Sequence, residues 1–227
     1  MAIARPLHTA LTLRVPVDAT ILNADLAIPA EAHGIVLFAH GSGSSRHSPR
    51  NQFVARVLQQ SDFGTLLMDL LTEKEEAVDN RTREMRFDIK LLARRLTATI
   101  DWLQTQPSFQ KLPIGIFGAS TGAAAALVSA ADRPELVKSV VSRGGRPDLA
   151  GDALPRVKAP TLLIVGGYDD AVQALNEQAQ ARMTTQVSLK IVPRASHLFE
   201  EPGALSQVAD FAAGWFWDTL KEHKEKK

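Results

Sequence analysis

The chain has 227 residues, of which 45% are hydrophobic and 22% charged, with a formal net charge of +1 and no cysteine. The near-neutral balance argues against binding to a nucleic-acid backbone, which needs a clustered basic surface. The missing cysteines exclude disulfides, thiolate metal sites and thiol redox chemistry. Length and apolar content predict one domain over residues 1–220, followed by a charged, disordered tail over residues 221–227.

The sequence gives no sign of a cofactor, a metal or a membrane segment. Its six histidines show no metal-ligand spacing. The first fifteen residues lack the continuous apolar segment of a signal peptide, and no later run is long enough to span a membrane. We therefore expect a cytoplasmic protein without cofactors, which acts on a small molecule rather than on a nucleic acid or a membrane.

Two strands are predicted near the N-terminus, over Thr9–Val15 and Thr20–Ile28. A turn at Pro16-Val17-Asp18 would join them as an antiparallel pair at the edge of a sheet. From Gly34 onward, short apolar runs alternate with longer amphipathic ones, which is typical of a parallel sheet covered by helices on both faces.

A strand predicted over Gly34–Ala39 leads into a loop of small residues, His40-Gly41-Ser42-Gly43-Ser44-Ser45. Small residues let backbone amides approach a substrate carbonyl closely. The amide of Ser42 is therefore a candidate donor to an oxyanion, whereas His40 is expected to be a structural hydrogen-bonding residue.

The same loop could instead begin a dinucleotide-binding motif, because a helix is predicted after it at Gln52–Gln60. Arg46 stands where that motif needs its third glycine, and no acidic residue lies at the usual ribose-binding distance, although Asp62 and Asp69 are near it. The mixed-charge segment over residues 73–86 is expected to be a solvated loop and helix start, with gating of the site as the alternative.

The run Gly118-Ala119-Ser120-Thr121-Gly122 lies between a predicted strand, Pro113–Phe117, and a predicted helix, Ala123–Ala131. A G-x-S-x-G match in this context indicates a nucleophile elbow, in which the glycines allow the sharp turn and the serine hydroxyl is exposed. Ser120 is the candidate nucleophile, and the Thr121 amide is the candidate second oxyanion donor. A glycine-rich turn with an incidental serine is the alternative.

Arginines follow the next predicted strand, Val137–Val141, in the segment Ser142-Arg143-Gly144-Gly145-Arg146-Pro147-Asp148. Ligands of open parallel sheets bind at the carboxyl ends of the strands. Arg143, together with Arg46, is therefore a candidate site for an anionic group of the substrate. The alternative is a pair of surface arginines that pair with nearby carboxylates.

A serine nucleophile needs a base and an acid, which follow it in the order acid, then histidine, in elbow-bearing enzymes. The strand Thr161–Val165 ends near Asp169 and Asp170, and Ser188–Val192 ends near His197. Only His197 and His223 follow these aspartates, and His223 lies in the charged tail, so His197 is the candidate base.

The two aspartates differ in their relation to the helix predicted at Ala171–Met183. Asp170 with Gln173 fits a capping box, whereas Asp169 has only Val172 at that spacing. We therefore assign Asp170 to the helix cap and Asp169 to the acid that orients His197, with exchanged roles as the alternative.

The motifs HGSGSS, GASTG, VGGYDD and ASHLFEEPG resemble, in this order, those of the α/β-hydrolase superfamily, and within it the lidless dienelactone hydrolase-like group. The resemblance spans nearly the whole chain. It implies a mostly parallel sheet between two helix layers, an antiparallel N-terminal pair and no cap domain. Dienelactone hydrolases proper use a cysteine nucleophile, so serine esterase activity is better supported than dienelactone hydrolysis.

These features together predict a serine hydrolase of short-chain or small soluble esters and lactones, with Ser120, His197 and Asp169 as catalytic triad. Two alternatives stay open, which are an acyltransferase or perhydrolase that uses the same acyl-enzyme, and a non-catalytic binding protein of this fold. Trp215, Phe216 and Trp217 would form either part of the core or the contact surface of a homodimer.

Overall fold

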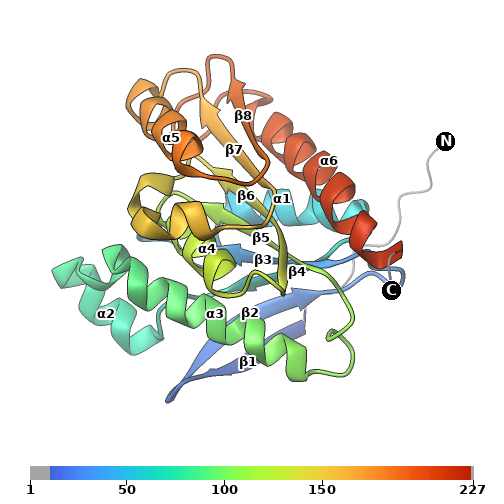
Figure 1. Cartoon of the computed structure of the whole chain (residues 1–227). Coiled ribbons are helices and arrows are strands. Elements are labelled where there is room, and N and C mark those ends of the chain that lie inside the picture. The colour runs from blue at the N-terminus through green and yellow to red at the C-terminus, as the bar shows by residue number, and fades with distance from the viewer. Residues whose placement is uncertain (1–10, 226–227) are drawn as a thin grey trace.

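The computed structural model describes residues 11–225 and consists of a single eight-stranded sheet with helices on both faces (Figure 1). The strands are β1 (Leu11–Val17), β2 (Thr20–Ala27), β3 (Ile35–Ala39), β4 (Gly64–Met68), β5 (Ile114–Ala119), β6 (Val137–Arg143), β7 (Thr161–Gly166) and β8 (Val187–Val192). The α-helices are α1 (Pro49–Gln60), α2 (Glu73–Thr82), α3 (Ile89–Thr105), α4 (Thr121–Asp132), α5 (Asp170–Arg182) and α6 (Ala204–Glu225). Two 3-10 helices, η1 (Met85–Phe87) and η2 (Pro147–Arg156), complete the chain.

The strand order is β1-β2-β4-β3-β5-β6-β7-β8. The pairs β1–β2 and β2–β4 are antiparallel, and all the other neighbouring strands are parallel. The predicted parallel sheet with an antiparallel N-terminal pair is thus confirmed. The parallel arrangement brings the carboxyl ends of all six strands from β3 to β8 to one edge of the sheet, where the chain continues in loops.

The turn between β1 and β2 differs from the prediction. Pro16 and Val17 pair with Ile21 and Thr20, and the turn begins at Asp18, whose φ is 51°. An aspartate tolerates this left-handed conformation. Proline is accepted in β1 because this strand lies at the edge of the sheet, where one side of the backbone has no partner strand.

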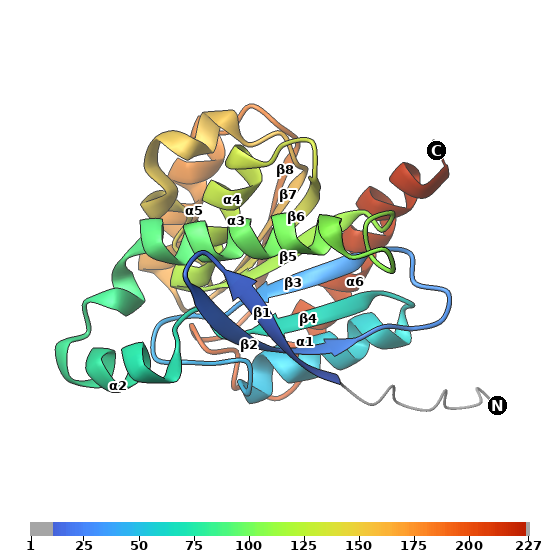
Figure 2. The same ribbon diagram turned by 90° about the horizontal axis from the view of Figure 1, so that it is seen from below.

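Each face of the sheet has its own apolar core. One core lies under α3, α4 and α5, and the other lies under α1 and α6 on the opposite face (Figure 2). The strands β3 to β7 are buried on both faces, which explains why the sequence shows them as continuous apolar runs rather than alternating ones.

The aromatic cluster of α6 belongs mainly to the second core. Phe216 is fully buried and Trp215 packs against it in part. Trp217 remains 39% exposed, with its ring 5.0 Å from that of His33 and a cation–π contact from Lys221. Core packing therefore accounts for two of the three aromatic residues.

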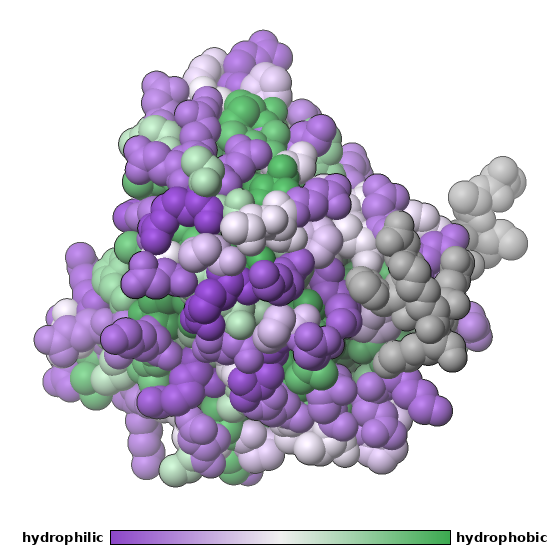
Figure 3. All heavy atoms as spheres, viewed as in Figure 1, coloured by the Kyte–Doolittle hydropathy of each residue, from purple (hydrophilic) through white to green (hydrophobic). Residues whose placement is uncertain are grey.

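The helix α6 extends to Glu225. The backbone of residues 221–225, where the sequence predicts the start of a disordered tail, is therefore helical. Among the described residues, no helix has both the length and the apolar character needed to cross a membrane. The face that carries α3 to α5 is mostly hydrophilic, with apolar residues in separate small patches (Figure 3).

Between β6 and β7 the chain forms only the short helix η2. This connection is too short for a separate cap domain, as the sequence predicts. The edge of the sheet where β5, β6 and β7 end is therefore not enclosed by a lid from this connection.

The charged segment over residues 73–86 is more ordered than the sequence predicts. It forms α2, which begins at a capping box of Thr72 and Glu75, and then η1. Both oxygens of Glu75 accept hydrogen bonds from the guanidinium of Arg95 on α3, which is 4% exposed. Arg95 also donates to the carbonyl of Leu70, at 2.7 Å, so one arginine connects β4, α2 and α3.

Replacing Glu75 by glutamine is expected to destabilise the protein in a pH-dependent manner. The hydrogen bond from Arg95 lowers the pKa of Glu75 from 4.5 to about 2. Because the folded protein holds the ionised form, this carboxylate stabilises the fold fully above pH 4.5, and its contribution is lost as the pH falls towards 2.

The difference in unfolding free energy between wild type and Glu75→Gln should therefore be largest near pH 7 and shrink between pH 4.5 and 2. Urea titrations over this range would measure it. Glu76→Gln, an exposed position of the same helix, is the matched control and should change stability little at any pH. A constant difference across the range would contradict the role of the Glu75 carboxylate.

Candidate active site

Ser120 lies at the junction between β5 and α4 in a strained backbone conformation. Its φ is 50° and its ψ is −121°, which is unusual for a residue with a side chain. Its amide donates to the carbonyl of Arg143 at 3.2 Å, and its carbonyl accepts from the amides of Ala123 and Arg146. These bonds fix the backbone on both sides of the turn, which has the geometry of the predicted nucleophile elbow.

Two glycines make this elbow possible. A Cβ at Gly118 would lie 2.5 Å from the Cα of Ala123, and a Cβ at Gly122 would lie closer than 3.0 Å to the carbonyl oxygens of Ala39 and His40. Both positions face backbone atoms, which cannot turn away as a side chain can. The motif therefore needs glycine on each side of Ser120 for close packing of the strand, the turn and the helix.

The structure brings His197 and Asp169 together at the same edge of the sheet. The Nδ1 atom of His197 lies 2.6 Å from Oδ2 of Asp169. With the Nδ1 hydrogen donated to the carboxylate, the Nε2 atom is left as the basic nitrogen. The His197 side chain is 38% exposed and that of Asp169 is 16% exposed.

The loop of His197 also lies against the end of β6. A Cβ on Gly144 would be 3.0 Å from the carbonyl oxygen of His197 and 3.6 Å from its ring atom Cε1. Gly144 follows Arg143, whose carbonyl is bonded to the Ser120 amide. The histidine ring and the elbow therefore flank the same short stretch of β6, although no hydrogen bond joins their side chains within the described structure.

The predicted cap of α5 is wrong. Asp169, rather than Asp170, occupies the N-cap position, and Asp170 is the exposed first residue of the helix. Gln173 does not reach back to the cap, because its side chain donates to Glu177 at 2.9 Å. The Asp169 carboxylate makes no capping bond, which leaves it to pair with His197.

The two predicted oxyanion donors lie close to the elbow. Thr121 is the first residue of α4, so its amide has no acceptor inside the helix. A Cβ on Gly41 would be 3.0 Å from the Cβ of Ser120, which places the loop of Ser42 directly beside the elbow. Within the described structure, neither the Ser42 amide nor the Thr121 amide has a hydrogen-bond acceptor.

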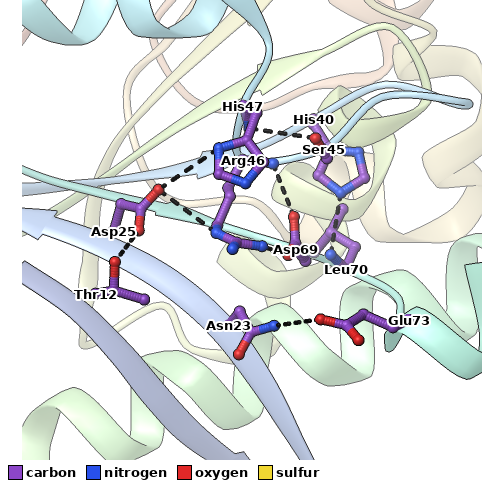
Figure 4. Close-up of polar contacts among 10 residues, drawn as sticks. All are labelled: Thr12, Asn23, Asp25, His40, Ser45, Arg46, His47, Asp69, Leu70 and Glu73. Carbon is purple, nitrogen blue, oxygen red and sulfur yellow. Dashed lines mark hydrogen bonds and ion pairs between the residues drawn. The ribbon is translucent and has the colours of Figure 1, made fainter.

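His40 fixes the start of this loop, as the sequence predicts. Its Nδ1 atom is 2.9 Å from the carbonyl of Gly41, and its Nε2 atom accepts from the amide of Leu70 at 3.0 Å (Figure 4). Burial lowers the pKa of His40 despite the Gly41 hydrogen bond and the nearby carboxylates, which act to raise it. A neutral ring suits these bonds, since Nε2 must accept while Nδ1 donates.

Arg46, which the sequence predicts as a second substrate-binding cation, is paired with carboxylates of the chain itself. It lies between Asp69 and Asp25 (Figure 4). Its amide and its guanidinium both donate to the Asp69 carboxylate, and its Nε atom is 3.5 Å from the Asp25 carboxylate. Two carboxylates therefore compensate its charge, and it joins β2, β4 and the loop after β3.

Arg143 is different, because it is 7% exposed and forms no ion pair within the described structure. Its guanidinium carbon lies 5.9 Å from the centre of the Phe199 ring. The arginine next to it in space is Arg50, the second residue of α1. The sequence does not single out Phe199, and its position two residues after His197 is the only signal that could have done so.

A pocket lies beside the oxyanion loop, between that loop and α2. Its walls combine polar residues with two leucines, and Arg86 closes one side, held there by the buried carboxylate of Asp79. The residues that line it are His40, Gly41, Ser42, Gly43, Ser44, Ser45, Asp69, Leu71, Glu76, Asp79, Asn80, Arg86 and Leu92. Within residues 11–225, no group of three or more acidic, histidine or cysteine side chains is arranged to hold a metal ion.

Comparison with known proteins agrees with this architecture. Residues 22–223 match the model of the dienelactone hydrolase family. The chain belongs to this family. A solved structure of a dienelactone hydrolase from Anabaena variabilis is 60% identical and superimposes with a TM-score of 0.93, over 94% of this chain and 99% of that one.

More distant structures share the fold of this dienelactone hydrolase family member. A lidless α/β serine hydrolase from Xanthomonas campestris is 19% identical, with a TM-score of 0.73 over 94% of this chain and 97% of that one. Among curated proteins, a putative phosphoribosyl transferase of Mycobacterium tuberculosis is 60% identical over 195 residues. Those residues are 86% of this chain but 43% of the relative, so the chain spans less than half of that protein's length.

Proposed function

We propose that this chain is a serine hydrolase of small carboxylic esters. The observation that carries the proposal is the elbow of Ser120, with its φ of 50°, next to a histidine whose Nδ1 atom is bound to Asp169. A serine hydroxyl is nucleophilic only when a base accepts its proton, and this arrangement supplies the base and the group that orients it.

In the proposed reaction, Nε2 of His197 takes the hydroxyl proton as Ser120 Oγ attacks the ester carbonyl carbon. The amides of Ser42 and Thr121 hold the negative oxygen of the tetrahedral intermediate. The intermediate collapses to an acyl-enzyme as the alcohol leaves with the proton from His197. Water, activated by the same histidine, then releases the acid and restores Ser120.

Small, soluble esters suit this site better than long lipids. The connection between β6 and β7 forms no cap domain that would enclose a long acyl chain. Without such an enclosure, a long apolar chain would gain little from burial. The transferase name of the mycobacterial relative does not decide the function here, because this chain matches 43% of that protein.

A fluorophosphonate probe tests the proposal on the wild-type protein. It reacts with a serine only where a base and an oxyanion site activate that serine. We expect covalent labelling together with hydrolysis of p-nitrophenyl acetate, and we expect peptide sequencing to place the label on Ser120. If the folded protein, checked by circular dichroism, takes up no label and hydrolyses no ester of a broad panel, the chain is not a serine hydrolase.

A further inference from the structure

Within residues 11–225, the side chain of Arg143 is a buried cation without a partner anion. It is 7% exposed, and none of these residues accepts a hydrogen bond from its Nε–H group. Burial lowers the pKa of Arg143 to about 10, and the nearby charge of Arg50 adds to this effect. At neutral pH the guanidinium therefore remains charged, although an isolated charge in the interior is unfavourable.

A second unsatisfied cation lies beside it. Arg50 is the second residue of α1, and its Nε–H group is also buried without an acceptor in the part of the chain that the structure describes. The only carboxylate paired with it in the described structure is Glu200, at 3.5 Å, whose side chain is 65% exposed. That contact is long and open to solvent, so it compensates little of the charge of the two arginines.

The first turn of α1 adds to the positive potential. This helix has 12 residues, begins with Ser48 as N-cap and Pro49 at the first position, and has no acidic residue in its first turn. Pro49 has no N–H, and the amides of Asn51 and Gln52 already donate to Ser48, so it is the helix dipole rather than a set of free amides that favours an anion here. In contrast, α2 carries Glu73, Glu75 and Glu76 in its first turn, although α3, α4 and α6 also begin without an acidic residue.

The loop that carries His197 lies on another side of Arg143. The ring of Phe199 faces the Arg143 guanidinium at 5.9 Å, and this contact offsets part of the cost of burying the charge. An aromatic face cannot accept the several N–H bonds that a guanidinium offers. The structure thus holds two arginines close together at the positive end of a helix dipole, and among the described residues only the exposed Glu200 carboxylate pairs with either of them.

We propose that Arg143 and Arg50, at the start of α1, bind a small oxyanion, a carboxylate or a phosphate, next to the loop of His197. A guanidinium group can donate two parallel N–H bonds to two oxygens of such an anion. The anion is either an acidic group of the ester substrate, which rests on the proposed function, or a free anion that binds without catalysis.

Direct binding is measured first, because it does not depend on hydrolysis. Titration of the wild-type protein with inorganic phosphate in a calorimeter, at constant ionic strength, should show saturable binding. Arg143→Met, which replaces the aliphatic part of the side chain by an unbranched apolar one and removes the guanidinium, should weaken this binding at least about tenfold. Glu200→Gln should strengthen it several-fold, because it removes the carboxylate that competes for Arg50.

The matched control is Arg146→Met, because Arg146 lies in the same loop but its guanidinium is already bound to Asp148 by two bonds, at 2.9 and 2.8 Å. Removal of the Arg146 guanidinium should leave phosphate binding within about twofold of wild type, because salt largely screens the proposed anion site from this change in charge. The unfolding free energy of Arg143→Met should equal or exceed that of wild type, because a buried unpaired charge is replaced by an apolar group beside Phe199.

Hydrolysis then identifies the source of the anion. Monophenyl succinate carries a carboxylate, and phenyl levulinate is a neutral ester of nearly the same shape. If the anion belongs to the substrate, Arg143→Met should lower kcat/KM about tenfold or more for the succinate alone, and phosphate should inhibit only that ester. If the anion is free, phosphate binding depends on Arg143 while the ratio of the two esters is unchanged.

The proposal is overturned if wild type binds no phosphate and shows no preference that depends on Arg143 for the acidic ester. It is also overturned if Arg143→Met binds phosphate as wild type does and hydrolyses both esters with an unchanged ratio. A loss of stability in Arg143→Met without any anion binding to wild type would assign Arg143 to the fold. If the protein hydrolyses neither ester, the proposed function is contradicted. The calorimetric titration then still tests whether Arg143 and Arg50 bind an anion.

Discussion

Replacing His197 by alanine is expected to lower kcat for p-nitrophenyl acetate by about ten-thousand-fold, because the Ser120 hydroxyl then has no base to accept its proton. Ser120→Ala should cause a loss of the same size and should also abolish fluorophosphonate labelling. The two losses should not add in the double variant, since the residues act as one unit. Initial rates at saturating ester would measure these effects.

The acid of the triad has a matched control next to it in the sequence. Asp169→Asn should lower kcat by about a thousandfold or more, because an amide at that position no longer stabilises the imidazolium and can hold the ring in the wrong tautomer. Asp170→Asn changes the same chemical group at an exposed position that has no bond to His197. It should leave kcat within about twofold of wild type.

Equal losses in the two asparagine variants would contradict the assignment of Asp169. A loss of kcat in Asp170→Asn but not in Asp169→Asn would show that Asp170, rather than Asp169, is the acid of the triad. Thermal unfolding of each variant separates these outcomes from misfolding. We expect all four single variants to unfold cooperatively, because the altered side chains lie in loops or at the start of a helix rather than in the apolar cores.

Gly122→Ala is expected to be the most destabilising of the conservative single substitutions in the site. The added methyl group would lie closer than 3.0 Å to the carbonyl oxygens of Ala39 and His40. Backbone atoms at the end of β3 would have to move, which we expect to cost about 3 kcal/mol of unfolding free energy. The oxyanion loop would move with them, so kcat should also fall.

Gly214→Ala adds the same methyl group but is expected to stabilise the protein. Gly214 lies within α6, and no described atom outside the neighbouring backbone of this helix lies within 4 Å of the place where its Cβ would be. Alanine there should raise the unfolding free energy by about 0.5–1 kcal/mol, because it restricts the unfolded chain and favours the helix. Urea unfolding of both variants measures the contrast. If Gly122→Ala is as stable as wild type, the backbone at the end of β3 can move to accommodate the methyl group, and the prediction is wrong.

Much of the site could be predicted because its signals are local. The apolar run before Gly118 and the helical run after Gly122 identify the elbow, since a strand and a helix have different periods of apolar residues. The order of Ser120, Asp169 and His197 along the chain then limits the choice of partners, because each follows a strand of the parallel sheet.

The errors concern interactions whose partners are distant in the sequence. Arg46 looks like a free cation in the sequence, but Asp25 in β2 and Asp69 directly after β4 neutralise it. The segment of α2 looks solvated, but Arg95 on α3 pairs with Glu75. Asp170 fits a capping pattern, but the start of α5 is fixed one residue earlier, where the Asp169 carboxylate pairs with His197.

The sequence by itself therefore determined the class of fold and the identity of the candidate nucleophile, because periodicity and turn chemistry depend on neighbouring residues. Only the tertiary structure decided which charges are compensated and which are not. Arg46 and Arg143 carry the same group, yet two carboxylates meet the first and none in the described structure meets the second. The difference arises from the order of the strands and from the helices packed on them, which bring distant residues within the few ångströms over which ions pair.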